Sequence, residues 1–137
     1  MSTWSIAALE LGTNVLDKAV ATYLTDCGRE LTIYNIAFLL SEEGGDRRIM
    51  VDTGFSSAEE ANRVTGERCR RTPEQELASQ LSRHGCGVAD IDTVILTHLH
   101  FDHCGNAPFF TRARAFIQRR ELQYSFAPLP GEEVPYF

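Results

Sequence analysis

Residues 89–106 read ADIDTVILTHLHFDHCGN, and they carry the strongest structural signal in this 137-residue sequence. The segment 91–96 is a short apolar run rich in β-branched side chains, which predicts a buried, parallel β-strand. Three of the four histidines of the chain, His98, His100 and His103, then fall within six positions. Four histidines scattered evenly along the chain would not cluster in this way, so the group calls for a chemical explanation.

The spacing of these histidines predicts a metal site. If the chain leaves the strand still extended, His98 and His100 point to one side, and the apolar residues that alternate with them point into the core. Asp102 and His103 follow where the chain turns into a helix, so they aim in a different direction. One tight turn can then serve two cations, with a pair of ligands for each. Imidazole and carboxylate ligands suit zinc, and also iron, manganese or cobalt.

The remaining pattern predicts an α/β domain. Residues 31–41 and 47–53 are expected to be two strands of a hairpin, joined by a turn. Helices are expected to begin near Ser56 and, with a capping box and Pro73 in the first turn, at Thr72. Shorter elements complete the set: an edge strand at 4–11, a strand at 113–117 and a helix at 119–125. Strands, helices, a buried strand and then a strand and a helix favour the α/β class.

Composition narrows the classes of function. Thirteen basic residues against nineteen acidic ones give a net charge of −6, which disfavours nucleic acid and anionic membrane surfaces as partners. No apolar run approaches the roughly 18 residues of a membrane span, and no secretory signal is recognisable at the start. Without such a signal, and with no C-x-x-C pair, the four cysteines are expected to be reduced thiols in a cytoplasmic protein. The basic segment 68–71 is expected to be a solvated loop.

Three segments resemble a known family. THLHFDHCGN at residues 97–106 resembles the metal motif of the metallo-β-lactamase superfamily, and IMVDTG at 49–54 is similar to its Asp-Thr-Gly landmark. ARAFIQRREL at 113–122 resembles the segment after the metal turn in the N-acyl-homoserine lactonases of that superfamily. The resemblance covers residues 31–125. It implies the N-terminal half of an αββα sandwich, with residues 1–137 as a single partial domain from which the C-terminal half of the fold is absent.

The resemblance also implies roles for individual residues. His98 and His100 would bind the first of two zinc ions. Asp102 and His103 would bind the second, and Asp52 would hold the metal turn through hydrogen bonds. The implied reaction is the opening of a lactone, with an N-acyl-homoserine lactone as the best candidate, which is the quorum-quenching reaction. A metal-bridging hydroxide would attack the carbonyl, and Asp102 would transfer the proton as the catalytic acid.

The family's remaining ligands are a later histidine, a bridging aspartate and a final histidine. No histidine or aspartate follows His103 in this sequence. The 137-residue chain alone is therefore expected to be incomplete as a catalyst. Half of a two-sheet fold would also leave an apolar sheet face in water, so we expect the isolated chain to be unstable, to aggregate or to self-associate.

Other functions remain open. A hydrolase of the same fold could act on another ester or a thioester. An inactive fragment or interaction module could retain the turn and bind a metal weakly. Asp52-Thr53-Gly54 also matches the triplet of a dimeric aspartic protease, but that reading would leave the histidine cluster unexplained.

Overall fold

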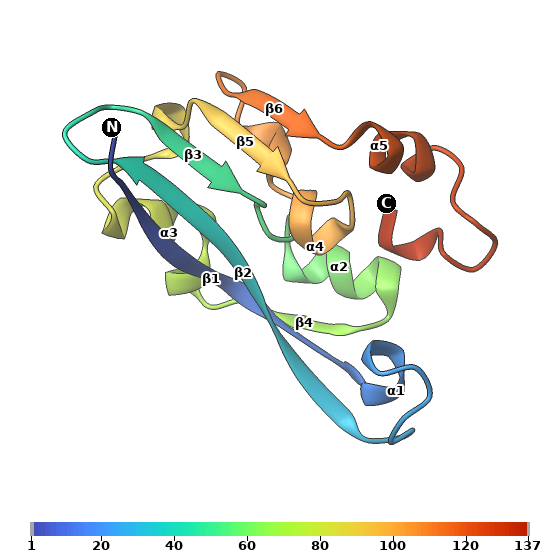
Figure 1. Ribbon diagram of the computed structural model, residues 1–137. Helices are drawn as coiled ribbons and strands as arrows, with labels where there is room; N and C mark the ends of the chain where they lie inside the picture. Colours follow the sequence, from blue (N-terminus) through green and yellow to red (C-terminus); the bar gives the residue numbers. More distant parts are fainter. Residues whose placement is uncertain (1, 137) are drawn as a thin grey trace.

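A mixed six-stranded sheet organises the computed structural model, which describes residues 2–136. The strands lie in the order β4-β1-β2-β3-β5-β6 (Figure 1). Their bounds are β1 (Trp4–Asp17), β2 (Glu30–Glu42), β3 (Arg48–Val51), β4 (Arg68–Arg70), β5 (Thr93–Leu96) and β6 (Arg114–Ile117). The helices are α1 (Lys18–Ala21), α2 (Ala58–Thr65), α3 (Leu77–Arg83), α4 (Phe101–Cys104) and α5 (Arg119–Ser125). None of the helices between residues 2 and 136 is long and apolar enough to cross a membrane.

Three antiparallel pairings and two parallel ones build the sheet, and one of the antiparallel pairings joins the short edge strand β4 to β1. β1 and β2 form a long hairpin whose far end, with α1, projects beyond the other strands (Figure 1). β2 pairs antiparallel with β3, which confirms the predicted hairpin. β3 and β5 run parallel, as do β5 and β6. Because parallel strands end at the same edge of a sheet, the residue that follows β3 lies beside the residue that follows β5.

The helix predicted from Thr72 is interrupted. The capping box forms, and the Thr72 N–H donates to Gln75 Oε1 at 2.9 Å, but it caps only a 3-10 turn at Pro73–Gln75. Glu76 is extended, with ψ of 139°, and α3 begins one residue later. The Gln75 amide also donates to Glu10 Oε1 at 2.6 Å, which ties the turn to β1. A side-chain contact with the sheet therefore accompanies a break that the helical pattern does not reveal.

Arg71 is not in a solvated loop, which corrects the expectation for residues 68–71. Its side chain is 4% exposed and lies over the ring of Phe55, with the guanidinium carbon 4.1 Å from the ring centroid. The guanidinium donates to three backbone carbonyls, including that of Leu11 at 2.8 Å. Arg71 therefore joins β1 to the segment that follows the Asp-Thr-Gly triplet.

The main core lies on one face of the sheet. Leu39, Met50 and Val94 are buried there, and Leu77 and Leu81 of α3 belong to the same buried cluster.

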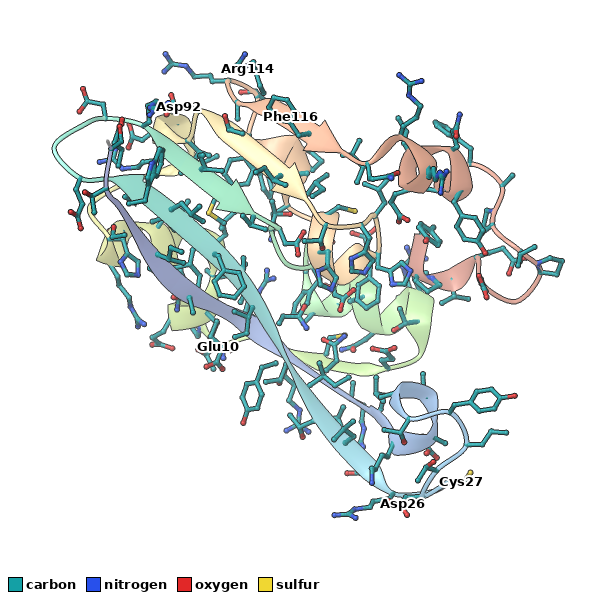
Figure 2. All side chains as sticks on the ribbon, viewed as in Figure 1. Glu10, Asp26, Cys27, Asp92, Arg114 and Phe116 are labelled. Atoms are coloured by element: carbon teal, nitrogen blue, oxygen red, sulfur yellow. The ribbon has the colours of Figure 1, made fainter. Side chains whose placement is uncertain are left out.

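The opposite face of the sheet carries an exposed apolar row. The strand registers place five side chains opposite one another in turn, namely Ala8, Phe38, Val51, Ile95 and Phe116. Phe38 is 42% exposed, Ile95 39% and Phe116, labelled on β6 in Figure 2, 52%. β5 is therefore buried on one face only. We call these five residues the apolar row.

Gly12 of β1 offers a test of how closely the sheet packs against Phe55 and Arg70. It has φ of +133°, and a Cβ there would lie 2.6 Å from Phe55 Cζ and 2.7 Å from the Arg70 carbonyl oxygen. We expect Gly12→Ala to destabilise the fold by about 2–5 kcal/mol through strain and overpacking. Gly66→Ala is the control, because its Cβ meets open space and only the left-handed backbone opposes it, at about 1–2 kcal/mol. Urea unfolding measures both, and equal losses would contradict the prediction.

Candidate metal centre

The metal turn begins where β5 ends. The chain bends at Thr97, and His100, which precedes the first residue of α4, is extended, with φ of −66° and ψ of 148°. Leu99 packs against the main core, and Phe101 is buried in a second cluster with Phe55. Apolar and imidazole side chains therefore alternate along this segment, as its sequence predicts.

Four predicted ligands gather in one place. The ring centroids of His98 and His100 are 4.4 Å apart, and those of His98 and His103 are 4.0 Å apart. His103 Nε2 lies 3.7 Å from Asp102 Oδ2. The sequence predicts two pairs of ligands that point in different directions, His98 with His100 and Asp102 with His103. In the structure, His98 lies close to His100 of its own pair and also to His103 of the other pair. All four side chains are half-buried.

Asp52 ties the two strand ends together. It follows β3 directly, and its Oδ1 accepts the backbone N–H of Thr97 at 2.8 Å, just after β5. The Thr97 hydroxyl donates to the same carboxylate, 2.8 Å from Oδ2. Oδ2 also lies 2.8 Å from His103 Nδ1. Asp52 has φ of +60°, a conformation that is strained for a residue with a Cβ and that the surrounding hydrogen bonds must hold.

These hydrogen bonds orient two imidazoles. When His103 Nδ1 donates to Asp52, its Nε2 is left as the free acceptor that a cation could use. Since the Thr97 hydroxyl donates to Asp52, its oxygen can accept from His98 Nδ1, which lies 3.0 Å away. The Nε2 of His98 is then also free for a ligand. The sequence did not single out Thr97, although its place directly before the first histidine was a usable signal.

The surroundings shift the pKa values of the three histidines in different directions. Burial, with repulsion from the other two histidines, lowers the pKa of His98. Burial also lowers the pKa of His100, despite the nearby Asp102 and Glu121 carboxylates. Burial opposes protonation of His103 as well, but its hydrogen bond to Asp52 and the charge of Asp102 outweigh that effect and raise its pKa. His98 and His100 therefore favour the neutral imidazole that binds metals.

Thr53 and Asn106 complete the support of the turn, and neither has a supporting role in the interpretation of the sequence. The Thr53 N–H and hydroxyl both donate to the His103 carbonyl oxygen, at 2.7 and 3.0 Å. The buried Asn106 amide donates to the carbonyl oxygens of Thr53 and Phe55 at 2.7 and 2.9 Å. The Asp-Thr-Gly segment and the metal turn therefore hold each other through backbone and side-chain bonds together.

The donor set fits a divalent cation in its chemistry. Three imidazoles and a carboxylate are ligands that zinc accepts, and two of the imidazoles have their Nε2 atoms free. Within residues 2–136, however, no three His, Cys, Asp or Glu side chains are arranged as a closed metal site. The structure therefore contains a cluster of donors, and the assignment of each one to a metal remains a proposal.

The sequence pattern of the metallo-β-lactamase superfamily matches residues 34–137. The chain belongs to this superfamily. This confirms the family resemblance of the motif segments, and the structural matches described next confirm the fold class.

Several of the proteins that this chain resembles are lactonases. An N-acyl homoserine lactonase of Bacillus thuringiensis is 28% identical over 131 residues, which cover 90% of this chain and 52% of that protein. The structure of an N-acyl homoserine lactone hydrolase with N-hexanoyl-L-homoserine at its catalytic metal centre matches with a TM-score of 0.77 and 27% identity, over 92% of this chain and 53% of that one. AidC, a dizinc quorum-quenching lactonase, shares the fold, with a TM-score of 0.64 and 18% identity over 93% of this chain and 47% of AidC. The chain thus spans about half the length of these relatives.

The stabilisation that the ion pair of Asp52 and His103 gives to the fold depends on pH. Burial would raise the pKa of Asp52, but hydrogen bonds from His103 and Thr97 outweigh it and lower that pKa. The stabilisation from His103 is present below its ordinary pKa and is lost as pH rises through the raised value. The stabilisation from Asp52 is lost as pH falls through the lowered value. The pair therefore stabilises the metal-free chain most between these two limits.

Asp52→Asn tests this pairing in the metal-free chain. We expect the pKa of His103 to fall, because the amide removes the negative charge that favours the imidazolium. Ring signals followed by NMR over a pH titration measure the change. Asp92→Asn is the matched control, because Asp92 lies near the start of β5, away from the metal turn (Figure 2), and bonds to the Arg48 N–H. An unchanged His103 pKa in Asp52→Asn would contradict the pairing.

Proposed function

We propose that this chain carries part of the active site of a metal-dependent hydrolase that opens a lactone, with an N-acyl-homoserine lactone as the best candidate substrate. The observation that carries the proposal is the cluster of His98, His100 and His103, with Asp102 beside His103, at the shared ends of two parallel strands. The lactonase names of the relatives support the substrate class.

Residue roles follow from the cluster. We assign His98 and His100 to a first zinc ion, and Asp102 and His103 to a second. Asp52 orients the turn. The dizinc description of AidC supports the choice of metal, and iron, manganese or cobalt would suit the same donors. When bound, such cations supply Lewis-acid activation of water and of the substrate carbonyl.

Hydrolysis adds water across the ester C–O bond, and the leaving oxygen must gain a proton. Asp102 is the only carboxylate between residues 97 and 103, so we assign that proton transfer to it. His103 Nε2 lies 3.7 Å from the Asp102 carboxylate, and His103 is in turn held by Asp52. The chain's own contribution is therefore to orient the imidazoles and to present one acid beside them.

We further propose that residues 1–137 act as a single partial domain, incomplete as a catalyst by itself. No histidine or aspartate follows His103, so the later ligands of the family find no counterpart in this sequence. The four cysteines are unpaired in the structure, which supports our proposal of a cytoplasmic location. Two alternatives stay open: the same chemistry on another ester or a thioester, and a non-catalytic module that binds a metal weakly. The lack of a closed ligand set within residues 2–136 favours the second of these.

Zinc binding tests the assignment of ligands. Equilibrium dialysis of the purified chain should give no more than about one tightly bound zinc ion per chain, because ligands for a complete pair are missing. His98→Ala should weaken that binding at least about tenfold. His84→Ala is the matched control, since His84 is exposed at the end of α3. Two tightly bound ions per chain, or equal binding by both variants, would contradict the assignment.

Activity needs a complete protein. In a full-length relative, replacing the histidine that matches His98 by alanine should reduce both bound zinc and lactone hydrolysis at least about tenfold. Unchanged turnover would contradict the proposed function. Substrate panels that include lactones, other esters and thioesters then separate the lactonase from its same-fold alternative.

The apolar row supports a further proposal, self-association of the isolated chain. Phe38, Ile95 and Phe116 are exposed in one row across the sheet, with Val51 between the first two, and burying them in a second copy would remove apolar area from water. Sedimentation velocity of the chain should show dimers or larger species. Ile95→Lys with Phe116→Lys should shift them towards monomer, whereas Tyr23→Lys, an exposed aromatic at the hairpin end, should not. A soluble wild-type monomer with cooperative thermal unfolding would contradict self-association.

A further inference from the structure

Glu121 reaches from α5 to the metal turn. Its Oε1 accepts the backbone N–H of Leu99 at 2.9 Å. Leu99 lies between His98 and His100, so this bond acts on the peptide that joins the two proposed ligands of the first metal. Glu121 lies in the first turn of α5, after β6. Neither the family motif nor the spacing of the histidines gives it a role.

The bond restrains a segment that the sheet does not hold. β5 ends at Leu96 and α4 begins at Phe101, so residues 97–100 belong to neither element. Asp52 holds Thr97, the first of these residues, through a hydrogen bond from its backbone N–H. Asp52 also holds the ring of His103, which follows the segment. Glu121 fixes the middle. A segment whose backbone is held at its start and at its middle has little freedom to redirect its two imidazoles.

Tyr136 contacts both His100 of the metal turn and Glu121. The ring of Tyr136, in the 3-10 turn Val134–Tyr136, packs edge-on against His100 with centroids 4.7 Å apart. Burial and a hydrogen bond to Glu121 raise the pKa of the Tyr136 hydroxyl. In Figure 1 this C-terminal turn lies near α2, α4 and α5. Glu121 is half-buried beside the His-Leu-His segment.

We infer that Glu121 is a positioning residue for the first metal: its carboxylate fixes the Leu99 peptide and thereby the directions of His98 and His100. The effect on metal binding rests on the proposed function, whereas the restraint on the peptide does not. Outer partners of this kind commonly change metal affinity by about 10- to 100-fold.

Three variants of the 137-residue chain test the inference. Glu121→Leu removes the acceptor at similar size. Glu121→Gln keeps an Oε1 oxygen that can accept the Leu99 N–H, and is the conservative rescue. Glu59→Leu is the control, because it also removes a first-turn carboxylate, from the exposed start of α2.

Two measurements are made on each variant. Hydrogen exchange of the Leu99 amide, followed by NMR without metal, should speed up at least about tenfold in Glu121→Leu and stay near wild type in the other two. Zinc affinity, by competition with a chromophoric chelator, should fall at least about tenfold in Glu121→Leu only. Exchange at core amides such as Val94 reports whether any variant has lost its fold.

The outcomes separate the two proposals. A Leu99 amide that exchanges freely in the wild type, or is unchanged in Glu121→Leu, overturns the positioning role. Unchanged zinc affinity in Glu121→Leu, with a wild type that binds zinc, overturns its link to the metal. Zinc affinity lost in Glu121→Gln as fully as in Glu121→Leu also overturns the inference, because the hydrogen bond would not be the cause. A wild type that binds no zinc overturns the proposed function, and the Leu99 exchange alone then decides the restraint.

Discussion

The carboxylate of Asp52 is the contact on which the candidate site depends. It stands at the end of β3 and accepts hydrogen bonds from Thr97, at the end of the parallel strand β5, and from His103 in α4. One side chain thus sets the relation between a strand end, a turn and a helix start. The positive φ of Asp52 shows that the backbone accepts local strain to place this carboxylate.

The rest of the site adds restraints to the same turn. Thr53 holds the His103 carbonyl, Asn106 holds the Asp-Thr-Gly segment in return, and Glu121 holds the Leu99 peptide. Arg71 and the buried Phe55 anchor the segment after the triplet to β1. Donors of a metal site are useful only when they are oriented before the cation arrives, because ordering flexible side chains would reduce the free energy of binding.

The same fold leaves an unusual surface. The core lies on one face of the sheet, under α3, whereas the other face carries the apolar row from Ala8 to Phe116. The chain also matches only about half the length of its lactonase relatives. Both facts agree with a chain that forms only part of the metallo-β-lactamase fold, and whose behaviour in isolation depends on what covers that face.

The sequence by itself predicted most of the elements and the candidate donors. Apolar and β-branched runs predicted five of the six strands, and the clustering of His98, His100 and His103 predicted a metal turn, because these signals depend only on local spacing; β4 lies in residues that were expected to form a loop. The break at Glu76 and the burial of Arg71 were decided by contacts with β1, which lies far away in the sequence. Glu121 likewise gained its role only when β5 and β6 paired in parallel and brought α5 beside the turn. Spacing along a chain encodes which groups are present, whereas strand pairing decides which of them meet.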